Sequence, residues 1–243
     1  WSFFAKGGEY SPYYQDLHLV VLWEKDGREI RHFVDDDGKL RSRPQGLEFN
    51  FVRALTYSER TASNLSVRVC PPGCFFSQVG PVVSVREQEL VRPLLGVLMS
   101  RVVAYFIELS AESVGAVTRA GAARHYTQGI IGSIPIPPCP ATVRELLDRL
   151  VCKIWKETAR IDAANETSRY FVGPRWKSSL DTPSLAHACE SRLRAAEDAW
   201  LRVINLSHEV ERLTRSLYDL DDNANSDIDY LVGKHPGVYP DGD

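Results

Sequence analysis

The sequence predicts an α+β fold, in which a mostly antiparallel, β-rich part is followed by a helical part with long antiparallel helices. Two observations support this class. Short apolar runs separated by turn residues fill positions 1 to about 85, whereas apolar residues recur at three- and four-residue steps from position 90 onward. We therefore expect three parts: a β-rich domain over 1–140 with a core helix near 90–109, a helical domain over 141–222, and an acidic, weakly ordered tail over 223–243.

The strands are expected in the first third of the chain. The apolar run from Leu17 to Trp23 predicts a buried strand, and Lys25–Gly27 supplies hairpin-turn chemistry, so that Glu29–Val34 is its expected partner strand. Leu65–Val69 alternates apolar and polar residues, as a half-exposed strand does. A turn at Pro71–Gly73 precedes two further strand-like pieces, Phe75–Phe76 and Pro81–Val85.

Helical spacing begins after residue 87. It predicts one helix over 90–109, a second over 142–163 and a long third over 184–220, with a small-residue loop at 115–132 after the first. Apolar residues from Leu193 to Leu217 form a stripe on the third helix. Packing against the preceding long helix is the simplest interpretation of this stripe, and a face that binds a partner is the alternative.

Charge is distributed unevenly along the chain. The formal net charge of −3 argues against a wholly electrostatic nucleic-acid binder, so any contact with a polyanion must come from a local patch. Positions 38 to 68 carry six basic residues against two acidic ones, whereas seven aspartates lie between Asp219 and the end. One region therefore suits a polyanion and the other repels it.

The composition also bears on location. We find no signal peptide and no apolar run of the roughly 18 residues that a membrane span needs, so no membrane partner is expected. Five cysteines, an odd number, favour a reducing, cytoplasmic location over a disulfide framework. Because the chain starts at Trp1 and enters strand-like sequence at once, we expect a fragment of a longer protein.

Two glycine- and arginine-containing segments are the most informative motifs. They are Lys6–Tyr10 and Gly38–Gln45, the second with the order Gly-Lys-Leu-Arg-Ser-Arg-Pro-Gln. Glycine lets a backbone approach a ligand closely, and arginine offers a planar fork to phosphates and guanine edges. These segments point toward DNA, although a plain glycine turn and solvated turn residues are the alternatives.

Several short motifs occur in a fixed order over residues 1 to 222, and their joint order resembles a known family. The family is the adenine-specific DNA methyltransferases of BREX-type phage-exclusion systems (PglX-like), relatives of combined restriction–modification enzymes, in their C-terminal half. The matching segments are 6–10, 23–27, 40–45, 65–68, 72–73, 95–102, 129–136, 166–171 and 217–220.

The chemistry of that family is missing from the chain. Its glycine-rich S-adenosylmethionine loop is absent, and its Asn/Asp-Pro-Pro-Tyr/Phe motif has no counterpart, because Cys70–Gly73 and Ile136–Cys139 hold the proline pair without the polar and aromatic partners. The resemblance therefore implies a target-recognition region that is not itself catalytic and holds no cofactor. S-adenosylmethionine, a catalytic methyltransferase domain and possible further defence-system subunits are expected with the parent protein.

The expected partner is double-stranded DNA. Basic side chains of the 38–68 region would contact phosphates or bases, with arginine favoured for guanine and glutamine for adenine. A polar–aromatic pair before the Gly129 turn could reach a groove, although a plain loop is the simpler interpretation. The predicted DNA-binding residues are Lys6, Lys39, Arg41, Arg43, Gln45, Arg53, Tyr57, Arg60, Asn64, Arg68, Tyr126 and Gln128.

Two other functions stay open. One is a helical protein-interaction scaffold of a defence complex without direct DNA binding. The other is an independent hydrolase or nuclease, for which Asp35–Asp37 is the only dense acidic triplet, beside a turn where solvent exposure explains it as well. Cys70 and Cys74 lack the further ligands that a structural zinc site needs, and no histidine belongs to a plausible nucleophile–base set.

Overall fold

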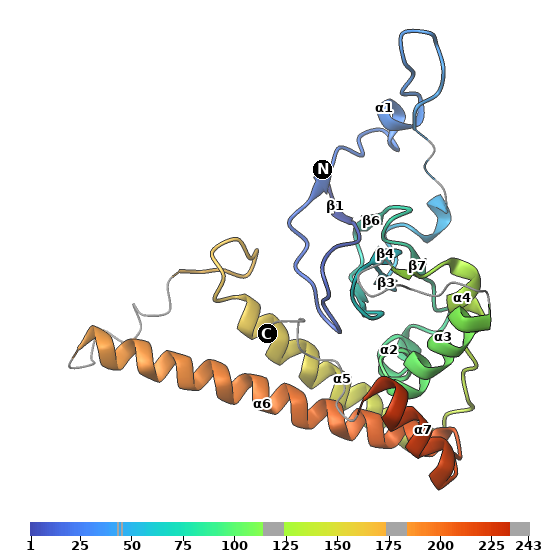
Figure 1. The fold of residues 1–243 in the computed structure, drawn as a ribbon. Helices are drawn as coiled ribbons and strands as arrows, with labels where there is room; N and C mark the ends of the chain where they lie inside the picture. The colour runs from blue at the N-terminus through green and yellow to red at the C-terminus, as the bar shows by residue number, and fades with distance from the viewer. Residues whose placement is uncertain (43, 45, 114–123, 174–183, 234–243) are drawn as a thin grey trace.

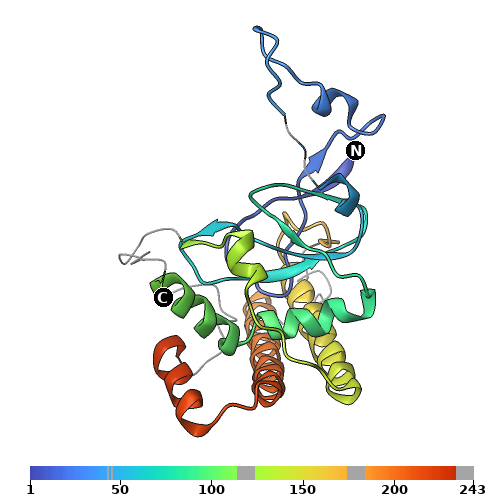
Figure 2. The same ribbon diagram turned by 90° about the vertical axis from the view of Figure 1, so that its right-hand side faces the viewer.

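Short strands and long helices occupy different parts of the molecule, which confirms the predicted α+β class. The computed structural model describes residues 1–42, 44, 46–113, 124–173 and 184–233. The strands lie between a projecting N-terminal segment on one side and a layer of helices on the other (Figures 1 and 2). The candidate site lies where the projecting segment meets the strands.

The strands form three small sheets. The first has the order β2–β1–β6, in which β1 (Ser2–Ala5) pairs in antiparallel fashion with β2 (Val20–Val21) and in parallel with β6 (Cys74–Phe76). Only two residues of the predicted 17–23 strand are therefore in a ladder, and the prediction that this strand is buried is wrong, because Val20 is 53% exposed. The parallel register sets Phe4 opposite Phe75, and this pairing puts two rings at the edge of the candidate site.

The second and third sheets are antiparallel. In the second, β3 (Ala54–Tyr57) lies between β5 (Val67–Cys70) and β7 (Val82–Val83), which confirms strands in the predicted 65–69 and 81–85 segments. In the third, β4 (Arg60–Thr61) pairs with β8 (Arg124–His125). The predicted 115–132 loop thus contains a strand and the short helix α4 (Gln128–Gly132), while 114–123 lie outside the described residues.

Residues 24–42 project from the sheets, and we call them the arm (Figure 1). The strand predicted at 29–34 is wrong: Arg28–Arg31 form helix α1. Lys25, Asp26 and Gly27 all have positive φ, so the chain makes a left-handed turn that starts a helix instead of a two-residue hairpin loop. An isolated bridge joins Val34 to Leu40 at the end of the arm.

The predicted 90–109 helix is two helices, α2 (Val91–Leu98) and α3 (Arg101–Ser113), at 68° to each other. The carboxylate of Glu211, from a helix far along the chain, accepts a hydrogen bond from the Arg101 N–H at 2.9 Å. Ser100 Oγ accepts another from the Val103 N–H at 3.4 Å. Both oxygens satisfy donors at the start of α3, which fixes the break.

The two long helices confirm their predicted positions. They are α5 (Ala141–Asp162) and α6 (Leu185–Leu217), which run side by side (Figure 1). Gly96 of α2 packs against both, since an added Cβ would lie 3.3 Å from side-chain carbons of Val151 and Val210. The missing side chain lets α2 approach the pair closely.

The prediction of a weakly ordered tail after residue 222 is wrong for the first half of that segment. Asp222–Val232 form helix α7, whose first turn is capped by Asp221 accepting from the Ala224 N–H at 2.7 Å. Arg215 of α6 holds this helix through Asn225 and Asp229 at 2.8 and 2.6 Å. Residues 234–243 lie outside the described residues.

One cluster of buried side chains connects the strands to the helices. It includes Leu55 of β3, Leu95 of α2, Ile154 of α5 and Val203 of α6. The predicted boundary at residue 140 therefore crosses a shared core, and the division into domains stays a prediction. Among the described residues no single helix is long and apolar enough to cross a membrane, and the bent pair α2–α3 passes that test only when both parts are combined.

Candidate nucleic-acid interface

The predicted DNA-binding residues fall into three groups. Arg43 and Gln45 lie outside the described residues. Tyr57, Arg68 and Tyr126 are buried. The exposed ones are Lys6, Lys39, Arg41, Arg53, Arg60, Asn64 and Gln128.

Arg68 is inside the protein, so its predicted contact with DNA is wrong. Its side chain is 1% exposed, and its guanidinium donates to Ser58 Oγ at 3.1 Å and to Ser66 Oγ at 3.3 Å. Burial lowers the pKa of this guanidinium to about 10. The Ser58 hydroxyl in turn donates to the Gly8 carbonyl at 2.8 Å, so Arg68 joins the N-terminal segment to the second sheet.

Tyr57 and Tyr126 are each 2% exposed, and the prediction that they touch DNA is wrong as well. Tyr57 is in β3, the central strand of its sheet, and burial, with a smaller effect of Glu59, raises its pKa to about 12. The Tyr126 hydroxyl donates to the Ser63 carbonyl at 3.3 Å. Both side chains belong to the hydrophobic core.

The glycine pair beside Lys6 makes its close backbone contact within the chain. A Cβ on Gly7 would collide with the Val79 carbonyl oxygen, and the Gly8 N–H donates to Ser58 Oγ at 3.0 Å. Packing against the turn between β6 and β7 therefore explains Gly7, whereas the neighbours of Gly8 are Ser58 and the Gln15 side chain. Lys6 stays exposed next to this contact.

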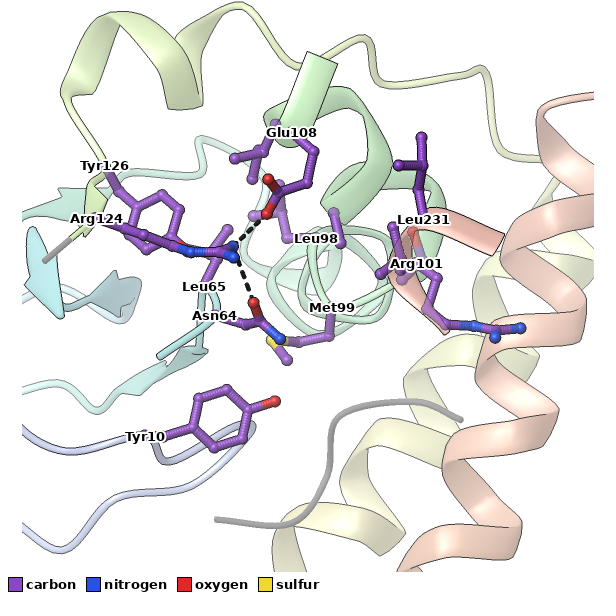
Figure 3. A pocket seen from close by; sticks show the side chains of 14 residues that line it. Tyr10, Asn64, Leu65, Leu98, Met99, Arg101, Glu108, Arg124, Tyr126 and Leu231 are labelled. Carbon is purple, nitrogen blue, oxygen red and sulfur yellow. Dashed lines mark hydrogen bonds and ion pairs between the residues drawn. The ribbon is translucent and has the colours of Figure 1, made fainter. Parts of the chain in front are cut away.

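Asn64 belongs to a polar pocket of about 390 Å³ between the third sheet, α3 and α7 (Figure 3). Its side-chain oxygen accepts from Arg124 at 2.9 Å, and Arg124 also forms an ion pair with Glu108. Arg101, at the far side, pairs with Glu211 at 3.4 Å. Each charged group of this pocket thus has a partner within the protein: the Arg124–Glu108 pair holds β8 to α3, and the Arg101–Glu211 pair holds α3 to α6.

A larger cavity lies where the arm joins the strands, and we call it the arm cavity. Its volume is about 630 Å³. Arg41 of the arm and Gln128 of α4, both predicted from the sequence to contact DNA, lie in its wall. The other lining residues that we use below are Phe4, Phe49, Phe75, Phe76, Ser77 and Gln78.

The aromatic wall of the arm cavity comes from three segments. Phe4 and Phe75 face each other across the parallel β1–β6 pair, with ring centroids 6.1 Å apart, and Phe76 follows on β6. Phe49 ends a short 3₁₀ turn that starts after Gly46, which has a φ of +60°. A Cβ on Gly46 would lie 3.2 Å from the Phe76 ring. Glycine therefore fits both the positive φ and the limited space beside this ring.

Polar groups converge on the same cavity from separate elements. Thr127 caps α4 by accepting from the Ile130 N–H at 3.3 Å, which sets Gln128 at the first position of that helix. Gln78 is exposed on the turn between β6 and β7, which is closed by the Ser77–Gly80 bridge. The Ser77 hydroxyl oxygen is buried and has no hydrogen-bond partner within the described part of the chain.

The Arg41 side chain forms an ion pair within the arm and is still accessible to a ligand. Its Nε lies 3.4 Å from a carboxylate oxygen of Asp35, and its side chain remains 58% exposed. Asp35 also accepts from the Lys39 N–H at 2.8 Å and so closes the turn that carries Lys39. An exposed pair of this kind is worth about 0–1 kcal/mol, so Arg41 can exchange Asp35 for a phosphate or a base.

The acidic triplet Asp35–Asp37 shows no sign of a metal centre. Asp35 is used for the turn and for Arg41, as described above. Across the described ranges, no group of three or more His, Cys, Asp or Glu side chains could hold a metal ion.

Comparison with known proteins shows a similarity to part of a methyltransferase. Over 110 residues, 45% of the chain, it is 27% identical to the adenine-specific methyltransferase PglX of Lacticaseibacillus casei (strain Zhang). The aligned part amounts to 9% of that protein, so the chain corresponds to a small portion of this relative. No protein-family model matches the chain. The similarity supports a PglX-like relationship.

Proposed function

We propose that the chain is the DNA-recognition part of an adenine-specific DNA methyltransferase, in a bacterial phage-defence (BREX-type) or restriction–modification system. In this proposal it contacts duplex DNA with the arm and the mouth of the arm cavity. The observation that carries the proposal is the meeting of Arg41, Gln78 and Gln128 at one cavity. Arginine and glutamine are side chains that read guanine and adenine edges. The similarity to an adenine-specific methyltransferase supports the methyltransferase part of the proposal.

Phosphates and bases would be contacted by different residues. Exposed cations outside the cavity, such as Lys39 and Lys6, would bind phosphates and set the position of the protein without reading sequence. Arg41, Gln78 and Gln128 would carry the sequence preference. The methyl group would be transferred to adenine from S-adenosylmethionine by a catalytic domain of the parent protein in the cytoplasm.

Salt-dependent DNA binding tests the proposal. Fluorescence anisotropy with a mixed-sequence duplex, from 50 to 200 mM NaCl, compares the unmodified chain with the double variant Lys39→Glu/Arg41→Glu. We expect the variant to bind about tenfold more weakly at 100 mM salt. The slope of log K against log salt should fall by about 1 for each phosphate contact that is lost.

The matched control carries the same change in net charge elsewhere. Arg149→Glu/Lys153→Glu reverses two exposed cations on α5, away from the arm. The control should keep both the affinity and the slope to within about twofold. Equal weakening by the two double variants would mean that the arm is not the DNA-binding surface.

A protein-interaction scaffold is the second candidate, because the first half of α6 exposes large apolar side chains. Leu185, Leu193 and Leu201 are 71%, 66% and 55% exposed. Leu193 is the first residue of the predicted packing stripe, so that stripe is only partly buried against α5. This function predicts no binding of duplex DNA even at 50 mM salt, and the same anisotropy experiment separates the two candidates.

A further inference from the structure

We infer that the arm cavity holds a single nucleobase taken out of its stack, an assignment that rests on the proposed function and names what that site binds. The first argument is shape. Edges of stacked bases are read by side chains that protrude into a groove, whereas here the polar side chains surround a hollow of about 630 Å³. This volume lies within the about 300–1,000 Å³ that is typical of sites for small molecules.

The second argument is the aromatic wall. Four phenylalanines line the cavity, and Phe49 is still 42% exposed there. A phenylalanine ring has no hydrogen-bonding group, so it offers a ligand only a flat apolar face. Every base has a π-face of the same kind, and stacking of bases on aromatic side chains is the common mode of binding to single strands.

The third argument is the polar rim. The Gln78 and Gln128 amides each provide donors and an acceptor, and Arg41 adds donors only. Ser77, on the same turn as Gln78, also lines the cavity. Alternating donors and acceptors are what the edge of an unstacked base presents.

The fourth argument is charge. The described lining residues of the arm cavity include Arg41 and no aspartate or glutamate. A site with one positive charge and no acid suits a base that is attached to a phosphate. The pocket beside Tyr14 is different, because Glu9, Asp16 and Asp162 line it.

The test compares strands that differ only in their bases. Binding of a fluorescein-labelled, mixed-sequence single strand of 20 nucleotides is measured against an abasic strand with the same number of phosphates. The unmodified chain should bind the base-containing strand about 5- to 150-fold more tightly, the range for one stacked base. Phe49→Ala and, separately, Gln128→Leu should reduce this preference to about twofold or less.

Phe3→Ala is the matched control. Phe3 is also 42% exposed and is next to Phe4 on β1, but it does not line the cavity. This variant should keep the full preference for bases. Gln128 is exposed, so its variant folds even if Phe49→Ala does not. Equal binding of the base-containing and abasic strands by the unmodified chain, or equal effects of Phe49→Ala and Phe3→Ala, would overturn the inference.

Two further measurements determine where the base comes from and distinguish this inference from the proposed function. Displacement of the strand by submillimolar deoxynucleosides assigns the site to free nucleosides, and no displacement assigns it to a base within a strand; both results support a nucleobase site. Duplex binding that depends on the arm but shows no base preference in single strands contradicts this inference alone. A base preference without any duplex binding contradicts the proposed function alone.

Discussion

At the scale of single residues, burial separates structural arginines from those that can reach a ligand. Arg68 and Arg41 both belong to the basic run of the sequence, yet Arg68 is 1% exposed and the side chain of Arg41 is 58% exposed. Arg68 lies between the N-terminal segment and the second sheet and binds two serine hydroxyls. Arg68 therefore serves stability, whereas Arg41 is accessible for the recognition role of the proposed function.

Substitution of Arg68 tests this assignment. Arg68→Ala leaves a cavity and should lower the free energy of unfolding by about 2–4 kcal/mol. Arg68→Met fills most of the space without a buried charge and should stay within about 1 kcal/mol of the unmodified chain. Urea unfolding measures both values. A lower salt slope of DNA binding in the folded Arg68→Met variant would show that Arg68 does contact phosphates.

The sequence predicted part of the candidate site. Arg41 and Gln128 were identified because their residue types and neighbouring turns favour contact with DNA, and both line the arm cavity. Gln78 and Ser77 were missed, because nothing in their local sequence indicates that the β6–β7 turn faces the arm. Leu65–Val69 alternates as a half-exposed strand does, but the N-terminal segment covers the Arg68 face of β5, because Tyr13 pairs with Arg68 and Gly8 is linked to the guanidinium through Ser58.

At the scale of elements, long-range contacts explain why the predictions for residues 90–109 and for the acidic tail differ from the structure. The apolar spacing of 90–109 is continuous, and the helix breaks before Arg101 because the Glu211 carboxylate of α6 and Ser100 Oγ accept from backbone N–H groups at the start of α3. By contrast, the α5 and α6 helices were predicted within a few residues, because their spacing is local and uninterrupted. The acidic composition after residue 219 hid α7, which is ordered by the Asp221 cap and by buried Ile228.

Among the acidic residues of the helical layer, substitution of Glu211 should therefore lower the free energy of unfolding most. It is 5% exposed and accepts from the Arg101 backbone, the Arg101 side chain and Arg215 Nε, the last at 2.7 Å. Glu211→Ala leaves two arginines without this partner and should lower the free energy of unfolding by about 3–5 kcal/mol.

Glu209→Ala is the control for that change, since Glu209 is exposed on the same helix. It should change the free energy of unfolding by less than about 0.5 kcal/mol. Urea denaturation followed by circular dichroism measures both variants. A Glu211→Ala protein as stable as the control would show that the break between α2 and α3 does not depend on this carboxylate.

At the scale of the whole molecule, alkaline pH should unfold the chain through its buried tyrosines. Burial raises the pKa of Tyr57 to about 12 from its usual 10. Between these values the unfolded chain loses a proton that the folded chain keeps, so this contribution to stability is complete below pH 10 and is lost as pH rises toward 12. The loss is about 1.4 kcal/mol per pH unit for one such group.

Tyr57→Phe removes the hydroxyl group whose titration makes the free energy of unfolding depend on pH. Its free energy of unfolding should fall less steeply between pH 10 and 11 than that of the unmodified chain, by about 1 kcal/mol over the interval. Tyr230→Phe is the control, because Tyr230 is 89% exposed. Urea unfolding at pH 8, 10 and 11 measures the slopes, and identical slopes for the two variants would rule out Tyr57 as a contributor.

The arm and the helical layer lie on opposite sides of the strands (Figure 2), which gives the molecule two separate ends for contacts. The arm end carries exposed cations and the arm cavity, and the helical end carries the exposed leucines of α6. Our account assigns DNA to the arm end. In the proposed function, the helical end is then available for a protein partner.

Backbone hydrogen exchange with and without duplex DNA tests this assignment most directly. We predict that DNA slows exchange in the arm turn at 37–42, in the β6–β7 turn at 76–80 and in α4, because these segments surround the arm cavity. Exchange in the first half of α6, residues 185–202, should not change. Slower exchange confined to α5 and α6, with the arm turn unaffected, would contradict the account.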